Sequence, residues 1–200
     1  MAQMSALDVM ISRTSPKEFT EPAPAGEALR LALEAAVAAP DHGRMRPWRF
    51  ILIEGEARHA FGRLLAKALR QRKPEAAAAE LEREAAKPLR APLVIVVAAR
   101  LAQRPGVPES EQVLAAGAAA QNLMLGLHAQ GFGAAWKTGE AAYDPRVKAA
   151  LGLAGSDAIV GFIYAGTPKP GDGAPPRPSS EQFVTRWQGV AADAAAAAPA

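Results

Sequence analysis

The chain has 200 residues, half of them hydrophobic, with a net charge of +3 at pH 7 and no cysteine. A chain of this length is expected to form one domain with a real core, and the lack of cysteine excludes disulfide bridges and thiolate chemistry. The mean hydropathy is −0.02, and no apolar run approaches the roughly 20 residues that a membrane-spanning helix needs.

The placement of charged residues and of histidines argues against nucleic-acid binding and against a metal site. The cations alternate with acids in stretches such as EARHAFGRLLAKALRQRKPE, which is typical of solvated helix faces rather than of a nucleic-acid surface. His42, His59 and His128 are far apart and lack metal-ligand spacing, so we expect no metal site. The first ten residues show no export signal, and we expect a cytoplasmic protein.

The apolar pattern predicts alternating helices and strands. Residues 6–13, 27–39 and 57–72 have helical spacing, as have the charge-dense stretch between Pro74 and Pro88 and residues 110–130 and 145–151. Strands are expected at 48–54, 93–98, 159–165 and in a short stretch leading into Trp136. Residues 93–98 are apolar without alternation, as in a strand that is covered on both faces. The helix at 110–130 is rich in alanine and glycine, which predicts a central helix packed on more than one side.

The C-terminal part changes composition. Residues 166–182 form a Pro/Gly-rich arm that is too long and too polar to fold on itself, and 183–187 (FVTRW) look strand-like. Because Phe183, Val184 and Trp187 need a surface to cover them, we expect the arm (166–187) to pack on a partner subunit. We therefore predict one domain over 1–187, followed by a low-complexity tail at 188–200.

Segment 12–19, SRTSPKEF, places Arg13, Ser15 and Lys17 at alternate positions around Pro16. Side chains alternate in an extended chain, so these three would lie on one side and could bind a phosphate or another anion. The alternative is a helix end in which Arg13 lies near the negative terminus while Ser15 and Lys17 face water.

Two other segments carry unusual polar residues. AAPDHGRMRPWRFILIEG, at 38–55, has a histidine, three arginines and Trp48 between a helix and a strand. The alternative interpretation is a polar turn in which Trp48 begins the core strand and the arginines face water. In GFGAAWKTGE, at 131–140, the glycine pair follows a helix and opens a strand, which is the reverse of the dinucleotide fingerprint. Gly139 could expose backbone N–H groups to a flat ligand, or the segment is a core strand with Trp136 buried.

In their order and spacing, these motifs resemble the FMN-dependent nitroreductase family, most closely its small members of the YdjA type. The matching motifs are ISRTSPKEFTEPAPAGEAL, AAPDHGRMRPWRFILIEG, AAGAAAQNLMLGLHAQGFGAAWKTG and IVGFIYAGTPKP, and the resemblance covers residues 4 to about 187. It implies an α+β sandwich, in which a central, mostly antiparallel sheet is flanked by helices. It also implies an intertwined homodimer with two FMN molecules at the subunit interface.

The resemblance further implies which residues bind FMN. The set is Arg13, Thr14, Ser15, Lys17, Ala38, His42, Trp136, Lys137 and Thr138. The first four would contact the phosphate, the ribityl chain and the pyrimidine edge, and the next two would reach the flavin from the other subunit. The last three would line the isoalloxazine and offer backbone donors near N5 and O4. The 38–49 loop would thus build a neighbour's pocket while Trp48 anchors it to its own core.

One position departs from the family pattern. The family often has Arg-Arg-Ser where this chain has Arg13, Thr14 and Ser15. The second cation is missing, so Lys169 or Arg177 could supply its charge.

The implied activity is ping-pong transfer of a hydride from NAD(P)H through the flavin to nitro compounds, quinones or similar electron-poor acceptors. Lys17 would stabilise the reduced flavin, which is anionic near N1. No residue is indicated as a general acid or base. Two alternatives stay open, namely a flavin-storage or flavin-sensing protein with little turnover and an anion-binding dimer without flavin.

Overall fold

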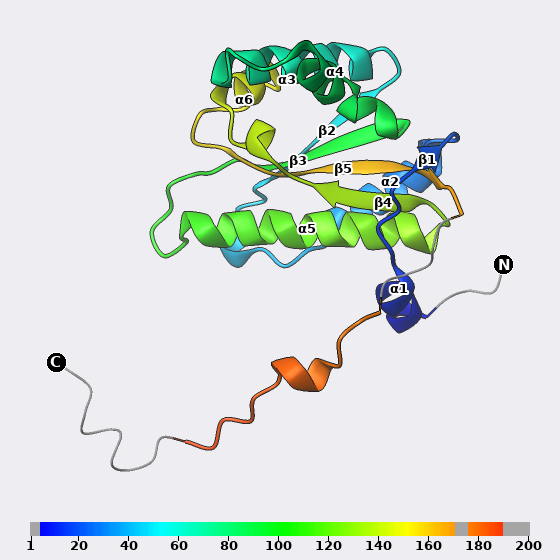
Figure 1. Cartoon of the computed structure of the whole chain (residues 1–200). Coiled ribbons are helices and arrows are strands. Elements are labelled where there is room, and N and C mark those ends of the chain that lie inside the picture. Colours follow the sequence, from blue (N-terminus) through cyan, green and yellow to red (C-terminus); the bar gives the residue numbers. More distant parts are fainter. Residues whose placement is uncertain (1–4, 171–175, 190–200) are drawn as a thin grey trace.

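The structure, a computed structural model, describes residues 5–170 and 176–189. Within them, five strands form one sheet with helices on both faces (Figure 1). The strands are β1 (Phe19–Thr20), β2 (Trp48–Glu54), β3 (Leu93–Ala99), β4 (Gly133–Lys137) and β5 (Ala158–Pro168). The order is β1-β5-β3-β2, β4 also pairs with β5, and every pair is antiparallel. The predicted α+β sandwich with a mostly antiparallel sheet is confirmed.

The helices follow the sequence pattern closely. They are α1 (Ala6–Ser12), α2 (Gly26–Val37), α3 (Ala57–Arg72), α4 (Ala78–Ala86), α5 (Glu109–Ala129) and α6 (Pro145–Ala150), together with the 3₁₀ helices η1 (His42–Arg44), η2 (Lys87–Arg90), η3 (Glu140–Ala142) and η4 (Ser180–Phe183). The helix expected between Pro74 and Pro88 is shorter than predicted, because α4 starts only at Ala78. Pro88 does not end the helical stretch but lies inside the 3₁₀ helix η2 that follows α4. Among the residues that the structure describes, none of the helices combines the length and the apolar character that crossing a bilayer requires.

The sheet separates two hydrophobic clusters. Strand β3 is buried along its whole length, and its side chains alternate between the faces. Leu93, Ile95 and Val97 join α2 and α5 on one face, while Val94 and Val96 pack toward α3 on the other. This two-sided burial explains the unbroken apolar run in the sequence.

The small residues of α5 allow close packing, as predicted. Ala116, Ala119 and Ala120 are fully buried. A Cβ added at Gly126 would lie 3.0 Å from the Cα of Ala32 in α2. The two helices therefore approach each other closely on one face of the sheet, a contact that long side chains would prevent.

The C-terminal part differs from its predicted form. Strand β5 continues to Pro168 because β1 pairs with its last residues. The strand expected at 183–187 is wrong, since η4 ends at Phe183 and the described residues after it form no strand. The Ser179 side chain accepts a hydrogen bond from the backbone N–H of Glu181 and so favours the 3₁₀ turn. Residues 171–175 of the arm and 190–200 of the tail lie outside the described residues.

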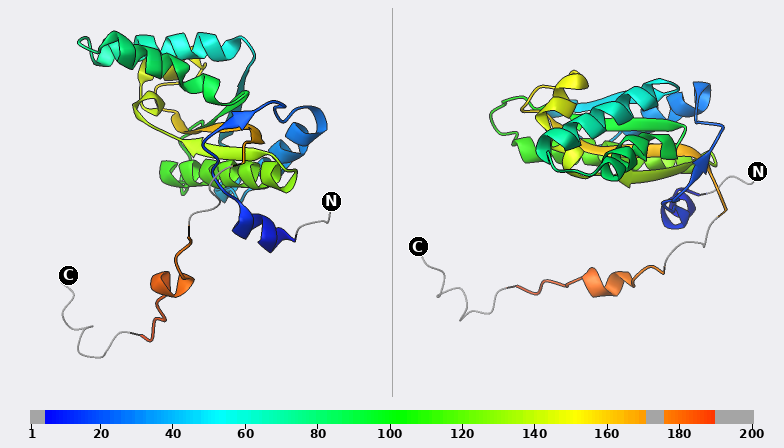
Figure 2. Two further views of the ribbon diagram at one scale, coloured as in Figure 1. Left: turned by 45° about the vertical axis from the view of Figure 1, so that its right-hand side comes forward. Right: turned by 45° about the horizontal axis from the view of Figure 1, so that its top comes forward.

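Helix α1 and η4 extend from the body of the molecule (Figures 1 and 2). No residue of α1 is buried, and Trp187, after η4, is 81% exposed. The apolar side chains of α1 and of residues 183–187 are thus left exposed by the part of the chain that the structure describes. Packing of the arm on a partner stays a prediction.

Candidate functional site

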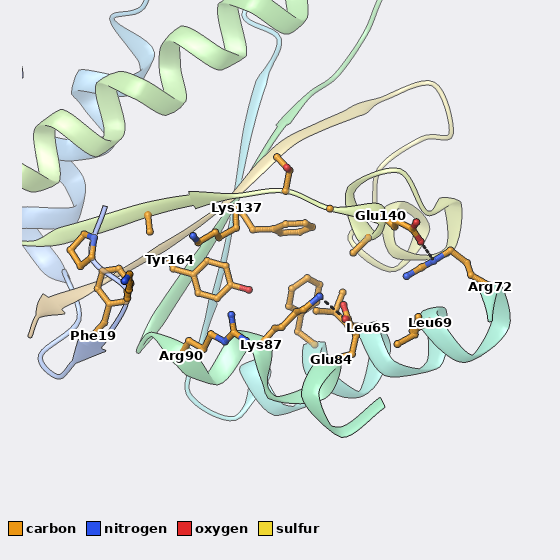
Figure 3. Close-up of a pocket in the computed structure, with 18 residues that line it drawn as sticks. Phe19, Leu65, Leu69, Arg72, Glu84, Lys87, Arg90, Lys137, Glu140 and Tyr164 are labelled. Carbon is orange, nitrogen blue, oxygen red and sulfur yellow. Dashed lines mark ion pairs between the residues drawn. The ribbon is translucent and has the colours of Figure 1, made fainter. Parts of the chain in front are cut away.

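A pocket of about 450 Å³ lies between the sheet and the helices α3 and α4 (Figure 3). Its apolar wall comes from α3 and from the facing strands, and its polar rim from α4, η2 and the segment after β4. The lining residues are Pro16, Lys17, Phe19, Phe61, Leu65, Leu69, Arg72, Glu84, Lys87, Arg90, Ala135, Lys137, Thr138, Gly139, Glu140, Ala141, Phe162 and Tyr164. The volume suits a small organic molecule.

The structure brings the predicted residues Lys17, Lys137 and Thr138 together at this pocket. Lys17 follows α1, whereas Lys137 is the last residue of β4 and Thr138 comes directly after it. The contact depends on Gly133, because a Cβ there would lie 2.9 Å from the Cγ of Pro16. A glycine at the start of β4 therefore lets the segment after α1 lie against the strand.

Strand β4 offers free backbone donors along its outer edge. Among the described residues it pairs only with β5, so the N–H groups on its other side lack a strand partner. The chain then turns at Gly139, whose φ of +130° is one that L side chains rarely adopt. An edge strand followed by this turn can donate backbone hydrogen bonds to a flat ligand.

The Trp136 side chain faces away from the pocket. Its indole packs in the cluster beneath α5, and its Nε1 donates to the backbone oxygen of Val160 at 3.2 Å. Gly161 makes room for it, since a Cβ there would lie 2.6 Å from the indole Cδ1. Trp136 can therefore reach a ligand at this edge only through its backbone.

Arg13, Thr14 and Ser15 form a cationic turn after α1. The Arg13 Nη1 donates to the Thr14 carbonyl oxygen at 2.7 Å and to the Ser15 Oγ at 3.1 Å. Arg177, from the C-terminal arm, donates to the Arg13 carbonyl oxygen. Burial, and then the nearby charge of Arg177, lower the pKa of Arg13. Neither arginine has an ion pair among the described residues.

Lys169, the other candidate for the missing charge, is already paired. Its Nζ lies 2.9 Å from the Glu18 Oε2, and the hydrogen bond from Lys169 lowers the pKa of Glu18. The structure thus places Arg177 beside the cationic turn, whereas the Lys169 ammonium is paired with Glu18.

Ala38 and His42 lie far from Arg13 within one chain. Ala38 is exposed at the end of α2, and the His42 Nδ1 is hydrogen-bonded to Glu111 near the start of α5. The turn that holds Arg13 begins at Ser12, whose Oγ lies 2.9 Å from the His128 Nε2 near the end of α5. At 1.5 Å per residue, the stretch of helix between Glu111 and His128 is about 25 Å long.

The 38–49 loop is braced by its own chain. Arg44 and Arg46 have positive φ angles, and the Asp41 Oδ2 accepts from the Arg46 backbone N–H at 2.6 Å. Trp48 packs against the core under α2 and α5. The expectation that Trp48 anchors this loop to its own core is therefore confirmed.

Sequence reasoning did not find Tyr164 and Arg90 as pocket residues. Tyr164 stands in the apolar run of β5 and is 8% exposed, and its hydroxyl makes no hydrogen bond to the part of the chain that the structure describes. Burial raises the pKa of Tyr164 to about 12, against a smaller opposing effect of Arg90. A polar tip inside an apolar strand was the available signal, because a buried tyrosine hydroxyl usually finds a partner.

Most acids of the pocket are already paired. Lys87 lies 2.5 Å from Glu84, and Arg72 lies 3.4 Å from Glu140 and also binds Asp144. Lys17, Arg90 and Lys137 have no ion pair among the described residues. Within residues 5–170 and 176–189, no group of three or more acidic or histidine side chains is arranged to hold a metal ion. The pocket is therefore suited to an anion with an apolar body.

The chain is similar to known proteins over most of its length. A family model described as "Nitroreductase family" matches residues 10–167. The chain is 41% identical over 166 residues to the Escherichia coli K12 protein named "Putative NAD(P)H nitroreductase YdjA", covering 83% of this chain and 90% of that protein. It is 36% identical over 167 residues to a Haemophilus influenzae protein named "Putative NAD(P)H nitroreductase", covering 82% and 89%.

Solved structures show the same fold. A nitroreductase-like family protein from Bacillus cereus superimposes with a TM-score of 0.82 at 25% identity, covering 94% of this chain and 99% of that one. A Desulfovibrio desulfuricans protein, described as a "putative nitroreductase in complex with fmn", superimposes with a TM-score of 0.72 at 25% identity and covers 94% and 100%.

Proposed function

The chain belongs to the nitroreductase family, and on that premise we propose that it is a cytoplasmic, FMN-dependent oxidoreductase. It takes its electrons from NAD(P)H and passes them to nitro compounds, quinones or similar electron-poor acceptors in ping-pong turnover. One observation carries the proposal: the family match over residues 10–167 includes every segment predicted to bind FMN. Lys17, Lys137 and Thr138 also line one pocket.

The residues present fit FMN. Arg13 and Arg177 lie side by side without a carboxylate partner in the described structure, and such a pair of cations is stabilised by an anion such as a phosphate. The free edge of β4 offers backbone donors for a flat ring system. When bound, FMN supplies hydride transfer at its N5 atom.

The residues of the chain then have separate tasks. Arg13, Ser15 and Arg177 hold the phosphate end, with Thr14 between the first two. The backbone of residues 136–138 would orient the ring, and the Lys17 ammonium would stabilise negative charge on it. No side chain is assigned as a general acid or base.

We also propose that each flavin site is shared in an intertwined homodimer. Within one chain, His42 and Arg13 are held near opposite ends of α5, too far apart to contact the same FMN molecule. A site shared between subunits would bring the Ala38 and His42 of one chain to the Arg13 of the other. The arm over 166–187 would pack on the partner and cover Phe183, Val184 and Trp187.

The visible absorption spectrum of the purified protein tests the cofactor. A yellow protein is expected, and heat or acid should release all the colour as FMN, because the chain has neither a cysteine nor a flavin-attachment histidine in a suitable motif. Finding FAD, or no flavin even after reconstitution, would contradict the proposal. NADPH oxidation in the presence of a quinone separates an enzyme from a storage or sensing protein, which would bind FMN with little turnover.

A mixed dimer tests the shared site. An Arg13→Ala subunit combined with a His42→Ala subunit should place both lesions in one site and leave the other intact. Such a heterodimer should bind about one FMN with near-normal affinity. Two equally weakened sites would show that each site is built from a single chain.

A further inference from the structure

The pocket carries positive charge that its own acids do not neutralise. Its two carboxylates, Glu84 and Glu140, are paired with Lys87 and Arg72. Lys17, Lys137 and Arg90 line the same space with no ion pair among the described residues. FMN binding as proposed uses Lys17 and the end of β4. Arg90, on η2 across the pocket, is not used by it.

The part of the pocket near Arg90 also holds a phenol hydroxyl that makes no hydrogen bond to the described chain. The Tyr164 hydroxyl and the Arg90 side chain point toward the same part of the cavity (Figure 3). Tyr164 is 8% exposed, and its hydroxyl lacks a hydrogen-bond partner within residues 5–170 and 176–189. A tyrosine hydroxyl is protonated at neutral pH, so the Tyr164 O–H can donate a hydrogen bond to an acceptor that binds in the pocket.

The surroundings of this pair are apolar and aromatic. Phe61 and Phe162 pack with their ring centroids 5.9 Å apart, and Leu65 and Leu69 of α3 continue the same wall. Such a wall binds a planar hydrocarbon ring, while a guanidinium and a phenol bind a carboxylate through charge-assisted hydrogen bonds. The two features lie in one cavity and suit one ligand.

We propose that this pocket selects aromatic electron acceptors that carry a carboxylate, with Arg90 and Tyr164 binding the carboxylate. The proposal rests on the proposed function and names the substrate class of that site. For a nitroaromatic acid, one N–O bond breaks and the nitro group becomes a nitroso group. The hydride from NAD(P)H and one solvent proton supply the two electrons and two protons, the oxygen leaves as water, and NAD(P)⁺ is formed.

The test compares 4-nitrobenzoate with 4-nitrobenzamide, an uncharged analogue of similar shape, as acceptors for the FMN-loaded protein. The wild type should favour the benzoate in kcat/KM. Arg90→Gln should lower the benzoate-to-benzamide ratio about tenfold, the lower end of what a charge-assisted hydrogen bond contributes. Tyr164→Phe should lower it severalfold, and Arg90→Lys should recover part of the loss because the charge is kept.

Arg70→Gln is the matched control. Arg70 is exposed on α3 and does not line the pocket, so the same charge change there should leave the ratio within twofold. Binding provides a second readout without turnover. Benzoate should perturb the flavin absorption of the oxidised wild type at lower concentration than benzamide, and Arg90→Gln should remove this difference.

Three results would overturn the inference: a wild-type ratio near one, a ratio unchanged by Arg90→Gln, or an equal effect of Arg70→Gln. The last would indicate a general effect of net charge rather than a site. These outcomes are separate from failure of the proposed function. That failure would appear as a protein without FMN, or as one for which neither nitro compounds nor quinones support NAD(P)H oxidation.

Discussion

Gly62 in α3 and Gly117 in α5 are both glycines inside helices, and alanine should affect the free energy of unfolding in opposite directions at the two positions. A Cβ at Gly62 would overlap the backbone oxygen of Ala85 in α4 and approach its carbonyl carbon to 3.0 Å. A Cβ at Gly117 would meet only the Trp136 ring, at 4.0 Å, which is an ordinary contact. The comparison therefore isolates the packing of α3 on α4.

The magnitudes follow from these contacts. Replacing a helical glycine with alanine gains about 0.5–1 kcal/mol, whereas overpacking costs about 1–3 kcal/mol. Backbone of α4 cannot rotate away as a side chain could, so Gly62→Ala should destabilise the protein by about 1–2 kcal/mol net. For a chain of this size, that lowers Tm by roughly 2–8 °C. Gly117→Ala should raise Tm by roughly 1–4 °C.

Thermal unfolding followed by circular dichroism measures both variants. Protein concentration and FMN occupancy must be equal in all samples, because ligand binding and association shift the apparent stability. If Gly62→Ala is as stable as the wild type or more so, α4 does not pack on α3 as described. A loss of stability in Gly117→Ala would contradict the space seen beside Trp136.

Three further predictions concern the flavin, the dimer and a buried carboxylate. Arg13→Ala should weaken FMN binding roughly tenfold to a hundredfold. Lys17→Ala should weaken it less and should mainly change the redox potential of the flavin. Equal losses of affinity in FMN titrations would contradict these separate roles of Arg13 and Lys17. Deleting residues 180–200 should weaken the dimer and lower flavin occupancy together, measured by analytical ultracentrifugation and absorbance, whereas an unchanged dimer would show that the arm is not part of the interface. Asp144→Asn should lower the free energy of unfolding by about 1.5–3 kcal/mol at pH 7. Urea denaturation should show that the difference between variant and wild type becomes smaller below about pH 4. A difference that does not depend on pH would exclude the charge of Asp144 as its cause.

The pH dependence of Asp144→Asn follows from the buried Asp144 carboxylate. Burial opposes its ionisation, but hydrogen bonds from Arg72 and from the Arg146 backbone outweigh burial and lower the pKa of Asp144. A lowered pKa in the folded state means that the stabilisation is present above the ordinary value of about 3.9 and is lost as the pH falls through the folded value. Asparagine keeps the cap on α6 and removes only the charge.

The sheet was predictable because its signals are local. The unbroken apolar run of β3 and the four-residue spacing of Leu29, Leu33 and Val37 identify a strand and a helix without any tertiary information. The prediction of a strand at 183–187 was wrong because strand formation there depends on tertiary pairing and not only on local signals. Its β-branched and aromatic residues favour a strand, but no neighbouring strand is placed to pair with them in the described structure, and Ser179 caps a 3₁₀ turn instead.

The site was only partly predictable. Lys17, Lys137 and Thr138 were found because their motifs resemble a family, and the structure brings them to one pocket. Arg90 and Tyr164 carry no motif, and their meeting depends on how α4 and η2 lie over β5. Such a juxtaposition is set by tertiary packing and leaves no periodic pattern in the sequence.

The two walls of the pocket are held in place by different interactions. Tyr164 and Lys137 stand on β5 and β4, which are fixed by backbone hydrogen bonds to each other and, for β5, to β3. Arg90 stands on η2, after α4, and the position of that wall depends on the close approach at Gly62. A substitution that moves α4 should therefore change the choice between charged and neutral acceptors before it changes FMN binding, because the proposed contacts to FMN come from the sheet edge and the turn after α1.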